Sequence, residues 1–172
     1  GSEAQVLRAV EEAITGRLPG GWRLRTIRES ASGRMRPDAV FKVSSPGRET
    51  VDFVVEVKQT ASPSTLPGVI EQLSRYMEAA PKGSNQRAFL AARYLTPRAR
   101  EVLAERGVSY GDITGNLRLV ADRPGLFVEA EGATKDPWPS NQPLRTLRGR
   151  GTGRAVRAIV DFRPPYGVRE LA

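Results

Sequence analysis

Two short β-rich runs, with turn-forming residues between them, constrain the fold of this chain more than any other feature. The runs are Asp38–Val43 and Val51–Lys58, and the segment between them contains Ser, Pro and Gly. This arrangement predicts a β-hairpin. A hairpin centred on Gly47 pairs Val43 with Val51 and Asp38 with Glu56. Directly opposed residues have Cβ atoms roughly 4.5 to 5.5 Å apart, so these two carboxylates can share one metal ion.

The second run has one apolar face and one polar face, because side chains alternate along a strand. The apolar face consists of Val51, Phe53, Val55 and Val57. The other face consists of Asp52, Val54, Glu56 and Lys58. We expect the apolar face to pack on helices and the end of the polar face to open into a cleft. Two acids and a lysine placed together there are costly without an ion to organise them.

Helical patterns flank and follow this hairpin. Apolar residues at Leu7, Val10, Ile14 and Leu18 predict an amphipathic helix over Glu3–Leu18. Two prolines in Ser62–Gly68 break the chain, and a second helix follows and ends before Pro81. Thr96 and Pro97 supply an N-cap and a first-turn proline, which predicts a third helix ending at Gly107.

Five further segments of the first 130 residues have the composition of strands. The predicted strands are 22–27, 87–95, 108–110, 117–121 and 126–129. Strands that alternate with helices in this way predict an α/β fold built on a mixed sheet flanked by helices.

The chain contains no cysteine and no histidine. This excludes thiol nucleophiles, Ser-His-Asp triads and metal sites that need thiolate or imidazole ligands. A bound metal is therefore expected to be a hard ion held by carboxylates, Mg²⁺ or Mn²⁺.

The net charge of +8 over 172 residues indicates a polyanionic partner, and arginine supplies most of the positive charge. The planar guanidinium group suits phosphate, and phosphate contacts release counterions and favour binding. We therefore expect DNA as the partner, although an arginine-rich proteome gives the same composition. No run approaches the roughly 18 apolar residues of a membrane span, so we expect a cytoplasmic protein that does not contact membranes. The oligomeric state stays open, with a homodimer as one option.

Residues 132–172 differ in composition from the rest of the chain. Residues 132–152 are rich in Pro, Gly and Arg and are interpreted as a linker, and 153–172 resumes helical spacing. Clustered arginines in this region are candidates for contacts with the DNA backbone, namely Arg145, Arg148, Arg150, Arg154 and Arg157. A solvated linker is the equal alternative.

The hairpin and the helix after it resemble the PD-(D/E)XK nuclease superfamily, which includes restriction enzymes, Holliday junction resolvases and RecB-type nucleases. Pro37-Asp38 matches the first motif of that family, and Glu56-Val57-Lys58 matches its ExK motif after an apolar run. Gln72 and Tyr76 match the QxxxY motif of the RecB-like branch. Each motif is short, but their order along the chain is that of the family.

The resemblance covers residues 3–131 and implies a restriction-endonuclease-like fold and metal-dependent hydrolysis of DNA, with an endonuclease favoured over an exonuclease. Its catalytic residues map to Asp38, Glu56, Lys58, Gln72 and Tyr76, and its metal ligands to Asp38 and Glu56. The first helix of the family often adds an acid. We favour Glu11 over Glu3 for this role, with a solvated charge as the alternative.

Two further acids, Asp52 and Asp112, are interpreted as structural, and Asp112 is expected to close its turn.

Residues 153–172 resemble the start of a winged helix-turn-helix domain. This gives a rival function: a nuclease-like DNA-binding module without catalysis, in a transcriptional regulator or antitoxin. Nuclease activity with Mg²⁺ or Mn²⁺, compared with EDTA, discriminates between the two.

Overall fold

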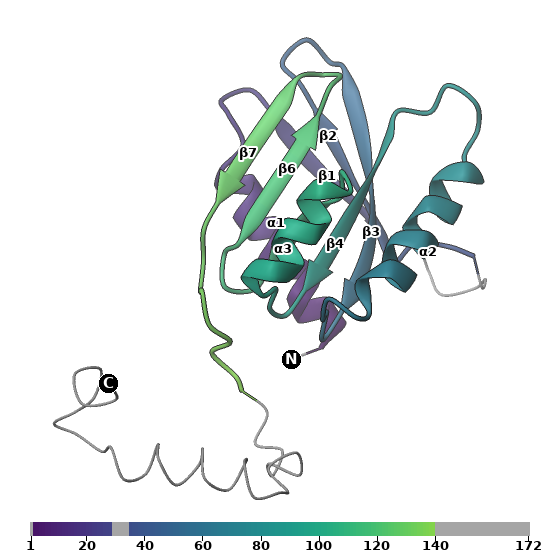
Figure 1. Ribbon diagram of the computed structural model, residues 1–172. Coiled ribbons are helices and arrows are strands. Elements are labelled where there is room, and N and C mark those ends of the chain that lie inside the picture. Colours follow the sequence, from purple (N-terminus) through teal and green to yellow (C-terminus); the bar gives the residue numbers. More distant parts are fainter. Residues whose placement is uncertain (1, 29–34, 140–172) are drawn as a thin grey trace, which may run out of the picture. The chain divides into compact units, whose positions relative to one another are not determined.

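The computed structural model describes residues 2–28 and 35–139 as three helices and seven strands (Figure 1). In chain order they are α1 (Glu3–Thr15), β1 (Arg23–Arg28), β2 (Ala39–Ser44), β3 (Thr50–Lys58), α2 (Leu66–Glu78), β4 (Gln86–Ala92), α3 (Pro97–Glu105), β5 (Ser109–Asp112), β6 (Leu117–Ala121) and β7 (Leu126–Ala130). All of these elements belong to one unit of the chain, Gly1–Pro137.

The strands form one mixed sheet in which spatial order follows sequence order, from β1 to β7. The pairs β1–β2 and β2–β3 are antiparallel, β3–β4 and β4–β5 are parallel, and β5–β6 and β6–β7 are antiparallel. Parallel neighbours need a crossover connection, and α2 and α3 provide the two that occur. The predicted α/β fold with a mixed sheet flanked by helices is confirmed, and it is consistent with a restriction-endonuclease-like fold.

The register of the predicted hairpin is also confirmed. Val43 pairs with Val51 and Ala39 with Val55, as a hairpin centred on Gly47 requires. Arg48 closes the turn with φ 66°, a backbone conformation that costs a non-glycine residue energy. Its N–H donates to the carbonyl of Ser45, and the Ser45 hydroxyl accepts from the N–H of Glu49.

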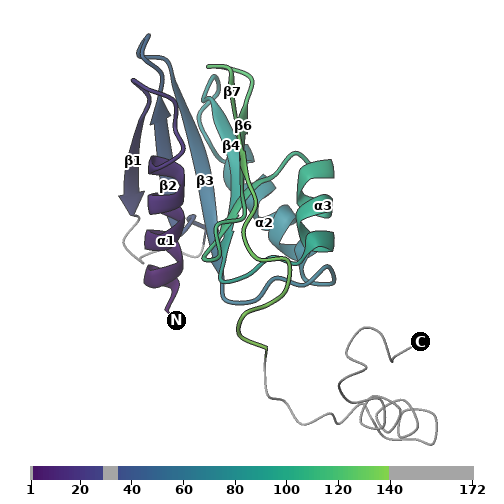
Figure 2. The same cartoon turned by 90° about the vertical axis from the view of Figure 1, so that its left-hand side faces the viewer.

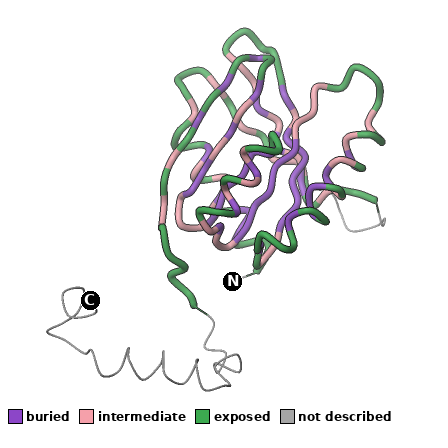
Figure 3. The backbone as a smooth tube through the Cα atoms, viewed as in Figure 1, coloured by how far each residue is buried: buried purple, intermediate pink, exposed green. Residues whose placement is uncertain are grey.

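Each face of the sheet has its own hydrophobic core, with α1 on one side and α2 and α3 on the other (Figure 2). The apolar row of β3 and the stripe of α1 lie in the first core, as predicted. The second core joins α2 and α3 to side chains of β3, β4 and β5. The strands are accordingly buried along most of their length at the centre of the sheet (Figure 3).

Three helix boundaries differ from the predictions, and the smallest difference is that the third helix ends at Glu105 rather than Gly107. The first helix ends at Thr15, so Leu18 packs against the core from the turn that follows rather than from the helix. The second helix begins at Leu66, and the predicted break up to Gly68 is wrong. A proline in the first helical turn loses no hydrogen bond, because N–H groups there have no intrahelical acceptor. Thr96 caps α3 as predicted, with its hydroxyl accepting from the N–H of Ala99.

The predicted linker begins within the described fold. Gly132 N–H donates to the side chain of Asn116, and Ala133 N–H donates to the hydroxyl of Thr114. The arginines predicted to contact DNA and the segment resembling a winged helix-turn-helix lie outside the described residues. In the part of the chain that the structure describes, no helix has the length and apolar character needed to cross a bilayer.

Candidate active site

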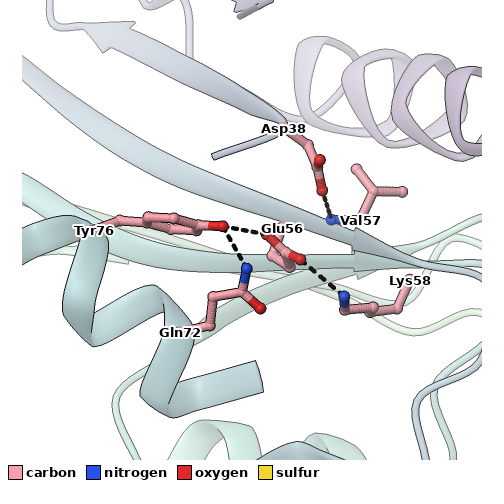
Figure 4. A network of polar contacts seen from close by, with 6 residues as sticks. All are labelled: Asp38, Glu56, Val57, Lys58, Gln72 and Tyr76. Atoms are coloured by element: carbon pink, nitrogen blue, oxygen red, sulfur yellow. Dashed lines mark hydrogen bonds and ion pairs between the residues drawn. The ribbon is translucent and has the colours of Figure 1, made fainter. Parts of the chain in front are cut away.

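Glu56 lies on β3, on the face covered by α2, and only 5% of its surface is exposed. The strand alternation that buries Val55 and Val57 against α1 turns Glu56 to the opposite side. A buried carboxylate needs partners to be tolerated. The structure provides them from the same strand and from α2 (Figure 4).

Lys58 is the first partner and follows Glu56 on the same face of β3, as predicted. Its Nζ lies 2.8 Å from Oε1 of Glu56. The Lys58 side chain is 37% exposed and that of Glu56 only 6%, so the pair lies at the boundary between the core and solvent. A charged donor and acceptor at this distance form a strong hydrogen bond.

The predicted family motif on α2 supplies the second partner. The Tyr76 hydroxyl donates to Oε2 of Glu56 at 3.4 Å, a long bond, and the Gln72 side-chain amide donates to the Tyr76 hydroxyl. The spacing of four residues places Gln72 and Tyr76 on the same side of α2. Gln72, Tyr76, Glu56 and Lys58 therefore form one chain of polar contacts (Figure 4).

Asp38 lies just before β2 and is held by the backbone of β3. Its N–H donates to the carbonyl of Val55 at 3.0 Å, and its Oδ2 accepts from the N–H of Val57 at 2.7 Å. Val57 separates Glu56 from Lys58, so Asp38 is fixed beside both residues. Its side chain is exposed and makes no other hydrogen bond within the described chain.

Burial raises the pKa of Glu56 above its ordinary value; the hydrogen bond from Lys58 opposes this increase, and the negative charge of Asp38 adds to it. The hydrogen bond to Glu56 raises the pKa of Lys58, which keeps the ammonium charged at neutral pH. Burial also raises the pKa of Tyr76, so the phenol keeps its proton. The site thus presents one cation, a protonated phenol and two mutually repelling carboxyl groups.

The two acids weighed on the first helix lie in different surroundings. Glu11, which the sequence favoured as a metal ligand, forms an ion pair with Arg28 at 3.6 Å. Glu3, at the start of α1, contributes to the electrostatic increase in the pKa of Lys58. Within residues 2–28 and 35–139, no three acidic side chains are grouped closely enough to hold a metal ion together. The structure therefore brings Asp38 and Glu56 together and does not add Glu11 to them.

The other acids have structural partners, as the sequence indicated. Asp52 pairs with Lys42, with 3.3 Å between Oδ1 and Nζ. Asp112 is 1% exposed, and its carboxylate accepts hydrogen bonds from the turn between β5 and β6 and from Leu95.

A cavity of about 310 Å³ adjoins the polar chain, and no pattern in the sequence indicates it. It is lined by Met35, Gly68, Glu71, Gln72, Arg75 and Tyr76. Met35 is 60% exposed, and a Cβ added at Gly68 would meet no atom within 4 Å. The cavity therefore borders the polar chain on the side of Gln72 and Tyr76.

The sequence matches no protein-family model and no curated protein. Two solved structures are similar in fold. One is EndoMS in its apo form, with 18% identity and a TM-score of 0.40. The other is a repair endonuclease from Pyrococcus abyssi, with 21% identity and a TM-score of 0.41. Each similarity covers 65% of this chain and 46% of the other, so the chain spans less than half of those proteins. At this level, neither protein supports an inference about the activity of this chain.

Proposed function

We propose that this chain is a metal-dependent nuclease that hydrolyses phosphodiester bonds in DNA. The observation that carries the proposal is the position of Asp38 beside the Glu56–Lys58 pair. Backbone hydrogen bonds fix the carboxylate of Asp38 to β3 between those two residues. Two carboxylates and an ammonium held together at the end of a strand can bind a metal ion and stabilise negative charge, which supports metal-assisted hydrolysis of a phosphodiester.

The donor set fits Mg²⁺ or Mn²⁺ held by Asp38 and Glu56. Both residues offer carboxylate oxygens, which hard cations prefer, and Mg²⁺ is commonly bound by one or two carboxylates together with water and substrate phosphate. The charge of Asp38 raises the pKa of Glu56, so the pair carries a repulsion that a cation would relieve. When bound, the metal would polarise the scissile phosphate and lower the pKa of a water molecule.

Lys58 supplies positive charge in this proposal. Because its pKa is raised, the residue is a poor general base at neutral pH, which favours an electrostatic role. A fixed ammonium stabilises the negative charge that develops on the phosphate in the transition state. It also orients the attacking water by donating a hydrogen bond to it.

Tyr76 and Gln72 are positioning residues. The Tyr76 hydroxyl donates to one oxygen of Glu56 while Lys58 engages the other, so the carboxylate is held in one orientation. Gln72 in turn fixes the hydroxyl of Tyr76. A carboxylate whose orientation is fixed in advance requires less reorganisation during the reaction.

The test is a cleavage assay with the full chain on duplex, single-stranded and branched DNA. We expect cleavage with Mg²⁺ or Mn²⁺ and none with EDTA. If purified protein cleaves no form with either metal, the proposal is wrong, and the rival function of a DNA-binding module without catalysis becomes the better account.

A further inference from the structure

The side chains of β1 alternate between the two faces of the sheet. Leu24 packs against the core under α1, and Arg28 forms its ion pair with Glu11 of that helix. Because side chains on a strand alternate, Arg23 and Arg25 point to the opposite face. Both are exposed there.

This opposite face is continuous with the candidate active site. Arg25 pairs with Lys42 across β1 and β2, and Lys42 pairs with Asp52 across β2 and β3. Asp52 lies on the same face of β3 as Glu56, because the two residues are an even number of positions apart. We call the side chains of Arg23, Arg25 and Lys42 the β1–β2 basic face.

Two of its three positive charges are not neutralised. Lys42 is balanced by Asp52, whereas the side chains of Arg23 and Arg25 form no ion pair or hydrogen bond with any residue in the described ranges. The second core places α2 and α3 over β3, β4 and β5. The arginines on β1 are therefore accessible to a large partner.

We propose that the β1–β2 basic face binds the phosphate backbone of DNA that extends from the active site, through Arg23 and Arg25. This proposal rests on the proposed function, since it assigns a substrate surface to the same site. Charge complementarity supports DNA as the occupant, because the guanidinium group suits phosphate and each contact releases counterions.

The spacing of the two arginines along β1 is compatible with the spacing of phosphates along a DNA strand. The last residue of β1, Arg28, pairs with the first residue of β2, Ala39. Asp38 directly precedes Ala39, so Arg28 marks the height of Asp38 along the sheet. Arg25 lies three residues before Arg28 along β1, and Arg23 lies five residues before it. At about 3.3 Å per residue, these separations along the strand are roughly 10 and 17 Å. One strand of duplex DNA rises about 3.4 Å per nucleotide. The two arginines would therefore meet phosphates roughly three to five nucleotides from the cleaved bond.

Arginine on an edge strand also discourages pairing with other strands. Any polar or charged side chain fills that role, whereas phosphate binding requires positive charge. The variants are therefore Arg23→Gln/Arg25→Gln, which removes two charges, and Arg23→Lys/Arg25→Lys, which keeps them. The matched control is Arg8→Gln/Arg17→Gln, because both residues are exposed and belong to the α1 side of the sheet.

Binding of the full chain to a fluorescent duplex is measured by anisotropy over a range of salt concentrations, in EDTA so that cleavage does not interfere. Thermal unfolding checks that every variant is folded. For Arg23→Gln/Arg25→Gln we expect the slope of log affinity against log salt to fall by about two. Affinity near 0.1 M salt should fall on the order of 10-fold or more. The lysine variant and the control should keep the slope of the parent.

The proposal is overturned if the glutamine variant binds like the control, or if the parent chain does not bind DNA. If the glutamine variant is misfolded, the lysine variant and the single substitutions Arg23→Gln and Arg25→Gln replace it, with a slope change of about one expected for each single substitution. Cleavage by the parent with Mg²⁺ is measured separately. A selective loss of binding without any cleavage by the parent would support this surface and contradict the nuclease activity.

Discussion

The carboxylate of Glu56 is the most constrained group in the candidate site. It is almost fully buried, and its neighbours are a lysine, a tyrosine and a second acid. Lys58 and Tyr76 stabilise the ionised form by hydrogen bonds, whereas burial and Asp38 destabilise it. Burying such a group costs stability, and natural proteins accept this cost most often at functional sites.

Metal binding tests the pair of carboxylates directly. Asp38→Ala and Glu56→Ala should each weaken the binding of Mg²⁺ or Mn²⁺ on the order of 10-fold or more. Loss of a residue that only supports a metal ligand already costs about 10-fold or more in metal affinity. Isothermal calorimetry measures the affinity. Glu11→Ala is the matched comparison, and its ion pair with Arg28 predicts little change. Unchanged affinity in both Asp38→Ala and Glu56→Ala would remove the proposed metal site.

The repulsion between Asp38 and Glu56 predicts a dependence of stability on pH in EDTA. A carboxyl group whose pKa is raised by folding contributes stability that is present below its unfolded pKa, and this is lost as pH rises through the folded pKa. Asp38→Asn removes one cause of the raised pKa of Glu56 and keeps an acceptor for Val57 N–H. The variant should therefore gain stability relative to the parent as pH rises from the unfolded pKa of Glu56 through its folded pKa.

Denaturant unfolding at a series of pH values measures this difference, and NMR titration of the Glu56 carboxyl should show a lower pKa in Asp38→Asn. A difference in stability that is constant across the titration of Glu56 would show that Asp38 does not act on Glu56 by charge.

At the scale of residues, the sequence identified site residues that are neighbours along one strand. It could not decide between residues whose distance from the site depends on how the elements pack. Glu56 and Lys58 share a face because they are two positions apart on a strand. Glu3 and Glu11 both lie on or near the stripe of one helix, and a helical wheel cannot tell which end of that helix lies near Lys58. The packing of α1 across the sheet decides this, and it favours Glu3.

At the scale of elements, the turn after β5 connects several parts of the fold. Asp112 accepts hydrogen bonds from Thr114 and Asn116 in the turn and from the N–H of Leu95 before α3. Asn116 and Thr114 then hold Gly132 and Ala133 after β7. This network explains why a fully buried acid is tolerated outside the candidate site.

Asp112→Ala should therefore destabilise the fold by about 3 kcal/mol or more, because several buried donors lose a charged acceptor at once. Asp112→Asn should cost less, since the amide oxygen keeps part of the network. Urea unfolding gives both values. Asp122→Ala is a suitable control, because Asp122 is an exposed acid in the turn between β6 and β7. A cost for Asp112→Ala no larger than that of the control would contradict the role of the network.

The sequence predicted the hairpin well because its register depends only on the turn and on alternation. The predicted start of α2 is too late, because a proline also fits the first turn of a helix, and Pro67 occupies that turn. The contact of Tyr76 with Glu56 joins residues twenty positions apart on different elements. Only the crossover from β3 through α2 to β4 brings them together, and local patterns contain no information on that distance.

At the scale of the whole molecule, positive charge is available on the sheet and also in the arginine-rich segment after it. Removal of residues 145–157 should flatten the salt dependence of DNA binding if Arg145, Arg148, Arg150, Arg154 and Arg157 contact phosphates. Anisotropy titrations of the full and truncated chains measure the slope. Equal affinities and equal slopes would show that the segment is only a linker.

The central claim is that Lys58 acts on the reaction, and one comparison of cleavage rates tests it most directly. Lys58 is partly exposed at the end of β3, away from the apolar row against α1. Initial rates of DNA cleavage with Mg²⁺ are measured for the parent, for Lys58→Ala, and for Lys82→Ala, in which an exposed lysine between α2 and β4 is removed. We predict that Lys58→Ala lowers the rate on the order of 10² to 10³-fold and lowers thermal stability, because Glu56 loses its charged partner, while the variant stays folded at the assay temperature and its DNA affinity stays close to that of the parent. Lys82→Ala should cleave normally. Cleavage by Lys58→Ala at the rate of the parent would contradict the account.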